Sequence, residues 1–600
     1  MFASPTILPR LVASTLFTEA DLYQARFAAS LAQEGHADLV AGLTALVSLA
    51  VREGHVCLRL GDVEVRERLA SLGLVETHAC LLTGVVGAPG SGLPLILDGE
   101  RLYLSRFFRD EAALAHAFRC LAGATPQDIP ADLLPDIFKA GGDETDWQDV
   151  ACFAALRSRL CVISGGPGTG KTTTVARILA LAARMHAGAN FRIRLAAPTG
   201  KAASRMTEAL AEAFPGGSLP PELDACLSQG AQTVHRLLGW SVGGFRHHQG
   251  NPLPLDMLVV DEASMLDLEL AARLMDALPE HASLVLLGDR NQLASVEAGA
   301  VLANLCREGV VNAFSPDFVA DAAKAGAPGL TVTPRALALT DNVVELKKSW
   351  RFDADSGIAA LSALIRDGQA QEAGKLLEVG RTDLEMLPGT GQANLAATLT
   401  PLLREAFKGL GETTDPARAF EIFGTLRLLS PVRKGPRGTE ALNLLAREAL
   451  HGATGNEWYP GRPVMILEND YNLGLFNGDV GIALPKDGTL RVFFPAAEGF
   501  TSFAPARLPR IETCYAMTVH KSQGSEFGHT VLVLPEEPCP VLGRELLYTA
   551  LTRAKRRFTL VGTVEQVKDA VLNPAHRDSG LKKMLEERYS HPQGSPNTFL

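Results

Sequence analysis

The sequence predicts an α/β protein with two parallel, doubly wound sheets, and two observations support this fold class. Between Trp147 and about Arg307, short apolar segments alternate with helical ones, and we expect strands at Leu160–Ile163, Ile193–Ala196, Met257–Val260 and Leu284–Leu287. A second alternating set begins near Val344, with strands expected at Leu426–Leu429, Val531–Leu534 and Phe558–Val561. Because 600 residues are too many for one core, we place one domain at 147–343 and a second at 344–600.

Three other regions have a different pattern. Residues 1–120 predict a mostly helical N-terminal domain, with apolar periodicity at Ala20–Leu31 and Leu39–Arg52 and no catalytic cluster. Residues 121–146 are Pro-rich and acidic, which is typical of a linker. Inside the second domain, short β runs are separated by Asn477-Gly478 and Asp487-Gly488, so we expect a small inserted barrel at about 461–509.

Net charge, cysteine pattern and apolar runs exclude several classes of protein. The net charge of −10 argues against a generally basic coat for nucleic acid but allows a local basic groove. The nine cysteines form no C-x-x-C pair, which makes zinc and iron–sulfur sites unlikely and fits a reducing cytoplasm. Pro5, Pro9 and Arg10 interrupt any signal peptide, and the apolar run Leu39–Val51 is too short to span a bilayer.

A phosphate-binding motif follows the first expected strand. Residues 165–172 match G-x-x-x-x-G-K-[ST], and a helix is expected from Thr172 onward. In such a turn, backbone N–H groups surround a triphosphate, Lys171 reaches its β- and γ-phosphates, and Thr172 holds Mg²⁺. The alternative, a glycine loop without a nucleotide, is disfavoured because both the strand and the helix are in place. The expected nucleotide contacts are Gly165, Gly166, Pro167, Gly168, Thr169, Gly170, Lys171, Thr172 and Thr173.

Polar residues after two later strands complete a candidate hydrolysis site. Asp261 is expected to bind Mg²⁺ and Glu262 to take the proton from the attacking water, unless the pair only caps a helix. Gln292 follows the next strand and is either a γ-phosphate contact or part of a plain turn. Arg351 and Arg553 are candidates for stabilising charge on the γ-phosphate, although a single arginine is more often on a solvated helix face.

Residues 518–527 are rich in hydrogen-bond donors and low in bulk, so they fit a segment that lines both a phosphate backbone and a nucleotide. A surface loop is the alternative. His235 taken alone is more often a structural histidine than a ligand contact.

The ordered motifs together resemble superfamily 1 DNA helicases. The motifs are GGPGTGKTT, AAPTGKAA, TVHRLLG, VVDEASM, LGDRNQLASVEAGAVL, KSWRF, LLSPVRKGPRG, GLFNGDVGIAL, AMTVHKSQGSEF and YTALTRAK. More narrowly, RHHQGNPLPLD, DWQDVA, EGHVCL and GERLYLSR resemble the RecD family, the alpha subunits of exonuclease V (RecBCD). The resemblance covers nearly the whole chain and is weakest at 1–50, at 310–342 and after about 575.

The resemblance implies two tandem RecA-like domains with an SH3-like barrel inserted in the second. It implies an ATP- and Mg²⁺-dependent 5′–3′ DNA helicase that acts on single strands and duplex ends in recombinational repair, in a heterotrimer with RecB-like and RecC-like subunits and without a membrane. Gln148 would recognise adenine, and Glu526 would meet the ribose. Arg351 and Arg553 would contact the γ-phosphate. The single strand would run along Thr199, His235, Thr518 and His520.

Three alternatives are open at this point. A freestanding RecD-like helicase would carry a longer N-terminal extension, whereas about 150 residues precede the motif here and EGHVCL resembles the partner-bound kind. A P-loop kinase or signalling NTPase does not account for a second half that carries Arg553. A nuclease would need an acidic metal cluster beyond Asp261 and Glu262, so strand cutting is expected of a partner.

Overall fold

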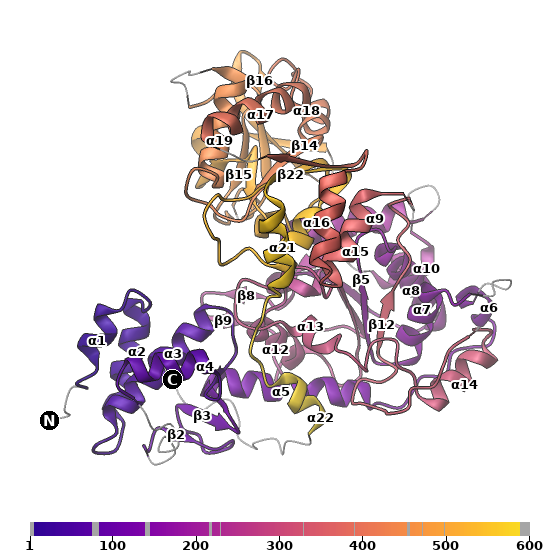
Figure 1. The fold of residues 1–600 in the computed structure, drawn as a ribbon. Coiled ribbons are helices and arrows are strands. Elements are labelled where there is room, and N and C mark those ends of the chain that lie inside the picture. The colour runs from indigo at the N-terminus through magenta and orange to yellow at the C-terminus, as the bar shows by residue number, and fades with distance from the viewer. Residues whose placement is uncertain are drawn as a thin grey trace.

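The computed structural model describes residues 5–74, 83–138, 144–214, 219–227, 230–327, 329–353, 355–388, 391–452, 457–470, 472–496 and 499–587. It contains a first α/β unit, a second α/β unit that carries a β insertion, and an N-terminal region beside the first unit (Figure 1). Within these residues, every helix is either too short or too polar to cross a lipid bilayer.

The first unit is built on a six-stranded parallel sheet of order β12-β5-β11-β10-β6-β7. Its strands are β5 (Leu160–Gly165), β6 (Ile193–Ala197), β7 (Gln232–Thr233), β10 (Met257–Val260), β11 (Ser283–Gly288) and β12 (Val343–Leu346). Its helices are α7 (Trp147–Arg157), α8 (Lys171–Met185), α9 (Gly200–Glu212), α10 (Pro221–Cys226), α11 (Val234–Leu237), α12 (Leu268–Ala277), α13 (Val301–Leu305) and α14 (Pro316–Lys324).

The central strands β5, β10 and β11 are buried along their whole length, which explains why they are mostly apolar. Alternate residues of β5 enter different cores: Val162 packs with residues of α12 and α13, and Ile163 packs with residues of α7 and α8. Because the strands are parallel, their carboxyl ends all lie along one edge of the sheet, where a doubly wound fold forms its site.

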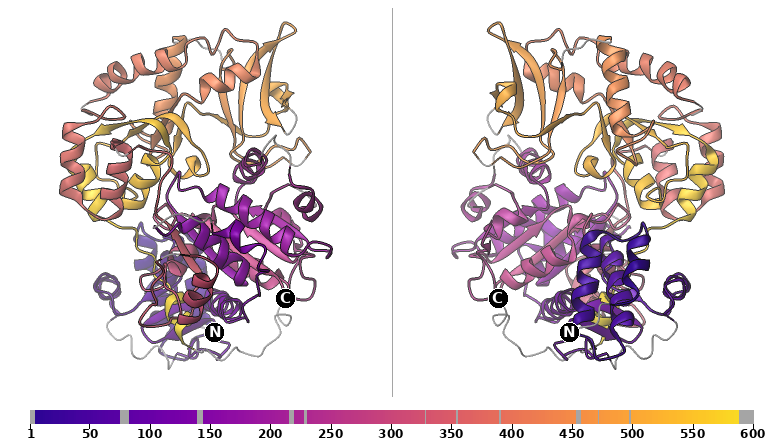
Figure 2. Two further views of the ribbon diagram at one scale, coloured as in Figure 1. Left: turned by 90° about the vertical axis from the view of Figure 1, so that its right-hand side faces the viewer. Right: turned by 90° about the vertical axis from the view of Figure 1, so that its left-hand side faces the viewer.

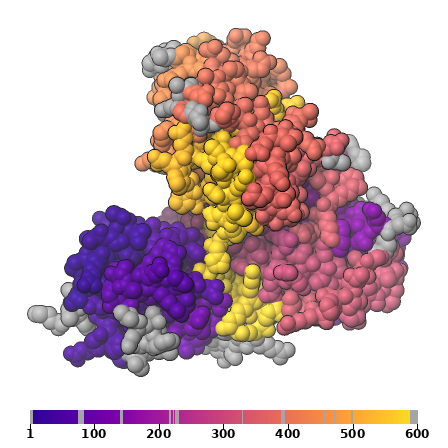
Figure 3. Space-filling view, viewed as in Figure 1, coloured from indigo at the N-terminus to yellow at the C-terminus, as the bar shows by residue number. Residues whose placement is uncertain are grey.

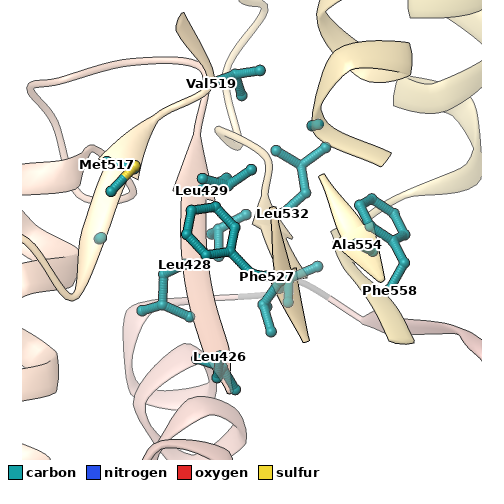
Figure 4. Close-up of a cluster of buried hydrophobic side chains, with 14 of the residues drawn as sticks. Leu426, Leu428, Leu429, Met517, Val519, Phe527, Leu532, Ala554 and Phe558 are labelled. Carbon is teal, nitrogen blue, oxygen red and sulfur yellow. The ribbon is translucent and has the colours of Figure 1, made fainter. Parts of the chain in front are cut away.

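The second unit has a five-stranded parallel sheet of order β13-β22-β21-β14-β20. Its strands are β13 (Leu384–Pro388), β14 (Leu426–Ser430), β20 (Ala516–Thr518), β21 (Phe527–Val533) and β22 (Ala554–Gly562). Its helices are α15 (Gly357–Arg366), α16 (Ala370–Val379), α17 (Gln392–Ala406), α18 (Pro416–Phe423), α19 (Thr439–His451), α20 (Arg544–Leu551) and α21 (Val564–Leu572). Figure 4 shows side chains of the central strands, among them Leu428, Leu532 and Phe558, gathered in one apolar cluster.

Between β14 and β20, the chain forms a separate antiparallel sheet of order β18-β17-β16-β15-β19. The strands are β15 (Pro463–Ile466), β16 (Val480–Lys486), β17 (Thr489–Ala496), β18 (Gly499–Phe503) and β19 (Ile511–Thr513). The turn between β16 and β17 has positive φ at Asp487 (51°) and Gly488 (74°), which is the conformation that an Asp-Gly hairpin favours.

The N-terminal region contains strands that periodicity did not reveal. Its helices are α1 (Leu8–Ala13), α2 (Glu19–Ser30), α3 (Ala37–Arg52), α4 (Val63–Ser71) and α5 (Ser105–Ala122). A four-stranded sheet of order β1-β4-β3-β2 accompanies them, formed by β1 (Leu58–Arg59), β2 (Val86–Gly87), β3 (Leu95–Asp98) and β4 (Arg101–Leu104). These strands have two to four residues, too few for alternation to stand out. The expected linker 121–146, of which 139–143 lie outside the described residues, contains α6 (Leu134–Ile137).

Two expected domain limits need correction. The boundary at 343/344 falls inside β12, which pairs with β5 in register Val343↔Val162, so the first unit includes residues up to Leu346. The second unit also does not extend to the end of the chain. After α21, the chain leaves that unit and returns to the N-terminal region, where α22 (Leu581–Glu586) packs beside α5 (Figures 1 and 2).

Candidate nucleotide site between the two α/β units

The phosphate-binding loop lies where β5 ends and α8 begins. Gly168 (φ 74°) and Gly170 (φ 82°) adopt left-handed conformations that L side chains rarely take. Lys171 is the first residue of α8, and its Nζ donates to the carbonyls of Gly165 at 2.6 Å and Gly166 at 3.0 Å. The ammonium group therefore lies directly over the loop whose N–H groups would surround phosphate.

Thr172 and Asp261 meet beside this loop, because the carboxyl ends of β5 and β10 share one sheet edge. Both residues line one small cavity with Val175, Met206, Leu210 and Leu287. A hydroxyl and a carboxylate are hard oxygen donors of the kind Mg²⁺ takes alongside substrate phosphates, so this pair fits that ion.

Glu262 stands next to Asp261 in an unusual conformation. It is a non-glycine residue in the left-handed region (φ 52°, ψ 38°), and its N–H donates to Asp261 Oδ1 at 2.8 Å. Such conformations cost about 1–3 kcal/mol and are concentrated at functional sites. Burial raises the pKa of Asp261, and the charge of Glu262 raises it further.

Gln148 lies against the same loop from the N-terminal side. Its backbone follows the helix cap Asp146, whose Oδ1 accepts the Gln148 N–H at 2.8 Å, and its Nε2 donates to Thr169 O at 3.0 Å. A Cβ at Gly170 would lie 2.2 Å from Gln148 Nε2, so Gln148 would have to move, and the φ of 82° at Gly170 itself favours glycine.

Gln292 directly precedes Leu293, the residue that is bonded to the second unit. Its Nε2 donates to the buried Asp289 at 3.2 Å, and its buried Oε1 has no partner among the described residues. The next residue, Leu293, donates its N–H to Thr549 Oγ1 at 2.9 Å and accepts from Gln523 Nε2 at 2.8 Å. Residues 289–293 are thus bonded across the unit boundary, which a plain turn would not require.

Tyr548 is a buried site residue that sequence reasoning missed. A Cβ at Gly166 would lie 3.0 Å from its hydroxyl oxygen, so the ring of the second unit reaches the phosphate-binding loop. Burial raises the pKa of Tyr548, and the charge of Asp289 and a hydrogen bond to it raise that pKa further.

Arg351 is held against the loop by its neighbours. Trp350 N–H donates to Gly168 O at 2.7 Å, and Ser349 Oγ donates to Pro167 O at 3.3 Å. The space beside Gly168 is filled by Arg351 itself, since a Cβ there would lie 2.3 Å from Arg351 Cβ.

The guanidinium of Arg351 pairs with Glu526 at 2.5 Å. Glu526 also forms an ion pair with Arg205 of α9, and its Oε2 is 3.7 Å from Lys555 Nζ. Burial alone would raise the pKa of Glu526, but the charges of Arg205 and Arg351 outweigh burial and lower it to about 2. Here Glu526 joins cations from both units. Arg205 and Lys555 are further residues that the motif comparison had not singled out.

Arg553 is only 3% exposed, so it is not on a solvated helix face. Its Nε donates to Thr549 O at 3.1 Å, and one terminal nitrogen donates to Ser525 O at 3.2 Å. Burial lowers the pKa of Arg553, while the charges of Glu262 and Glu526 act in the opposite direction. The guanidinium therefore lies within the electrostatic reach of the candidate base in the first unit.

Of the four candidate strand contacts, three lie where the two units approach each other. Thr199 caps α9, where its Oγ1 accepts the Ala202 N–H at 3.2 Å, and Thr518 and His520 flank the end of β20. The helix and this segment touch, because Arg205 donates to Gly524 O at 3.2 Å. His235 is on α11 beside Trp240 and Phe245 of the hairpin β8 (Trp240–Ser241) and β9 (Gly244–Phe245).

The fold and these contacts define a class: a P-loop NTPase whose phosphate-binding loop is contacted by Tyr548 of a second α/β unit, with Arg351 beside it paired to Glu526. Three family models match the chain: an AAA domain at 148–298, a UvrD-like helicase C-terminal domain at 513–561, and the N-terminal domain of RecBCD enzyme subunit RecD at 13–103.

Curated relatives match over most of the chain. RecBCD enzyme subunit RecD of Mycolicibacterium smegmatis is 37% identical, covering 94% of this chain and 97% of the relative. The Haemophilus influenzae subunit of the same name is 35% identical, covering 82% of this chain and 81% of the relative. The ATP-dependent RecD2 DNA helicase of Deinococcus radiodurans is 31% identical, covering 88% of this chain and 63% of the relative.

The chain belongs to the RecD family of RecBCD enzyme subunits.

Proposed function

We propose that this chain is the ATP-dependent 5′–3′ DNA helicase motor subunit of a RecBCD-type helicase–nuclease that processes duplex DNA ends in recombinational repair. The observation that supports the motor role best is the composite site: Tyr548 of the second unit reaches the nucleotide loop of the first, and the buried Arg553 lies within electrostatic reach of Glu262. Tandem RecA-like domains, with an SH3-like barrel formed by the β insertion, are the corresponding fold proposal.

In ATP hydrolysis, each candidate site residue of this chain would have its own role. Lys171 and the loop N–H groups would bind the β- and γ-phosphates, and Glu262 would accept the proton of the attacking water. Mg²⁺, held by Thr172 and Asp261, would neutralise phosphate charge when bound. Arg553 and Arg351 would approach the γ-phosphate from the second unit and favour the closed arrangement of the two units, and Gln292 would report its state across the boundary.

Glu526 would act in this cycle as an alternative partner of Arg351. In the structure, the arginine pairs with this carboxylate at 2.5 Å, and a γ-phosphate offers it a competing anion. Moving Arg351 from Glu526 to phosphate would change the link between the two units. For the proposed ribose contact, the Glu526 carboxylate would have to turn away from Arg205 and Arg351.

The single strand would lie across both units along Thr199, Thr518 and His520, with His235 nearer the hairpin. Alternating closure would move the strand by one step per ATP. The 5′–3′ direction is the one that the family resemblance implies.

A partner-docking role for the N-terminal region is supported by an exposed apolar face. Tyr23 (74% exposed), Phe27 (59%) and Leu31 (48%) are spaced four residues apart on and just after α2, so they share one side, and Val12 and Leu16 are exposed nearby. Contiguous exposed apolar side chains mark interaction surfaces. We assign this face, within the segment that matches the RecD N-terminal domain model, to a RecC-like subunit, with a RecB-like subunit completing the assembly.

The second candidate is a freestanding helicase, favoured by the similarity to the RecD2 helicase. The match at 13–103 to the RecD N-terminal domain favours the subunit instead. The relatives reported are bacterial, so a cytoplasmic location beside the chromosome follows from the proposed role.

The test is affinity purification of this chain from its native cell, followed by a strand-displacement assay with 5′-tailed and 3′-tailed duplexes. We expect RecB-like and RecC-like subunits in the purified complex and ATP-dependent unwinding of the 5′-tailed substrate by this motor. If the chain purifies without these subunits and still unwinds DNA, the result would favour the freestanding helicase. Unwinding only from 3′ tails would contradict the direction.

A further inference from the structure

The C-terminal segment 576–587, here called the C-terminal strap, connects three parts of the molecule. It leaves the second unit after α21 and runs between the N-terminal elements and the first unit, as the yellow strip in Figure 3 shows. Leu581, Met584 and Leu585 of the strap are buried in the same core as Phe107 and Phe118 of α5. The strap is therefore packed into a core that the N-terminal region shares with the first unit.

Arg577 of the strap binds the loop that continues from Gln292. One terminal nitrogen donates to Glu297 O and Gly299 O, each at 2.7 Å, and the other donates to Ser295 O at 2.5 Å. A single guanidinium thus satisfies three carbonyls within five residues. A planar fork of N–H donors suits such an arrangement better than an ammonium group.

The N-terminal region also contacts Arg577, through the turn at Gly54. Gly54 has φ 94°, and a Cβ there would lie 3.0 Å from the Arg577 guanidinium carbon, so the backbone of Gly54 covers the side chain. Gly54 O accepts the Gly299 N–H at 3.0 Å, and Asp578 O accepts the Val56 N–H at 2.8 Å. The turn at 54–56, the strap and the loop 295–299 are bonded to one another.

The same loop is linked to the nucleotide site within a few residues. Gln292 contacts Asp289, and Leu293 bonds to Thr549 and Gln523 of the second unit. A displacement of residues 295–299 would be passed along this short stretch to Gln292 and to the contact between the units.

We propose that Arg577 is a positioning residue for ATP hydrolysis: it fixes the loop 295–299 so that Gln292 and Leu293 are aligned between the two units, and it ties that alignment to the N-terminal region. The proposal rests on the proposed motor function and extends it. It predicts that movement of the N-terminal region when a partner docks alters the hydrolysis step through Arg577.

The test compares full-length Arg577→Ala and Arg577→Lys with wild type in ATPase assays with saturating single-stranded DNA. Misplacing a catalytic group by about 1 Å can cost about 10²-fold, so we expect kcat to fall at least about tenfold in Arg577→Ala. The KM for ATP should stay within about twofold because the phosphate-binding loop is untouched. Arg577→Lys should recover part of kcat, since it retains the charge but not the planar fork.

Lys583→Met is the matched control. Lys583 is on the same strap, and its ion pairs join Asp98 of the N-terminal region at 3.0 Å and Glu587 of the strap itself at 3.7 Å. We expect its kcat to remain near wild type. Equal losses in Lys583→Met and Arg577→Ala would show that the strap is only a tether and would overturn the proposal, as would an unchanged kcat in folded Arg577→Ala.

If Arg577→Ala does not fold, Arg577→Lys decides: a lowered kcat at unchanged KM supports positioning, and wild-type kcat overturns it. Lys171→Gln measured in parallel separates this proposal from the motor function. Retained hydrolysis in Lys171→Gln would refute the nucleotide site itself. An unchanged kcat in the Arg577 variants would refute only the role proposed for the strap.

Discussion

Replacing Glu526 by glutamine should loosen the contact between the two α/β units. The carboxylate joins Arg205 of the first unit, Arg351 and Lys555, and it is only 12% exposed. Its pKa is about 2, against an ordinary value of 4.5, and at about 1.4 kcal/mol per pKa unit the difference corresponds to about 3 kcal/mol. Glutamine keeps the shape but leaves the cations without a counter-charge, so we expect a loss of about 1–3 kcal/mol.

The pH dependence has a definite sign. A carboxyl group whose folded-state pKa is depressed contributes its full stability above the unfolded pKa, here near 4.5, and loses it as the pH falls toward about 2. The difference between wild type and Glu526→Gln should therefore be constant from about pH 8 to 6 and should shrink only below about pH 4.5.

Hydrogen exchange measured by mass spectrometry suits this test, because it reports local opening in a protein with several domains. The Phe527 N–H bonds to Arg553 O at 2.9 Å, immediately beside Glu526. A loss of about 1–3 kcal/mol corresponds to exchange about 5- to 150-fold faster at this amide. Glu385→Gln, which removes a pairing with Arg557 at the outer sheet edge, is the control. Exchange at Phe527 that is unchanged, or equally fast in the control, would refute the role assigned to Glu526.

Three further outcomes are expected. Lys171→Gln should abolish DNA-stimulated ATP hydrolysis with the fold intact in circular dichroism, because it removes the cation placed over the loop; near-normal turnover would remove the phosphate-site assignment. Glu262→Gln should bind ATP and Mg²⁺ but hydrolyse at least about 10²-fold more slowly in single-turnover assays, and a collapse of ATP affinity would instead make Glu262 a metal ligand. Changing Tyr23 and Phe27 together to serine should abolish co-purification with a RecC-like subunit and spare the ATPase, whereas retained assembly would move the docking surface elsewhere.

Features encoded in short stretches could be predicted from sequence. The apolar runs at Leu160 and Met257 became β5 and β10, and the glycine pattern gave a loop with positive φ at Gly168 and Gly170. These features depend on neighbouring residues and on backbone conformations that few residue types allow. The two-residue strands of the N-terminal region gave no periodic signal.

Contacts between distant parts of the chain could not be predicted. Arg205 and Glu526 are more than 300 residues apart, and nothing local to either indicates their pairing. Arg577 lies where the family resemblance is weakest, and its role depends on the return of the chain to Gly54 and the loop 295–299. Sequence motifs indicated the candidate nucleotide contacts more readily than the residues that hold those candidates in place.

In the proposed motor, the second unit completes the ATP site of the first. Steady-state ATP hydrolysis by Arg553→Ala, with saturating single-stranded DNA, tests it most directly. The side chain is buried within the electrostatic reach of Glu262, so its contact should matter more in the transition state than in the bound ground state. We predict a kcat about 10³-fold or more below wild type with a KM for ATP close to normal, and DNA binding without nucleotide unchanged. An unchanged kcat in the folded variant would contradict a composite site.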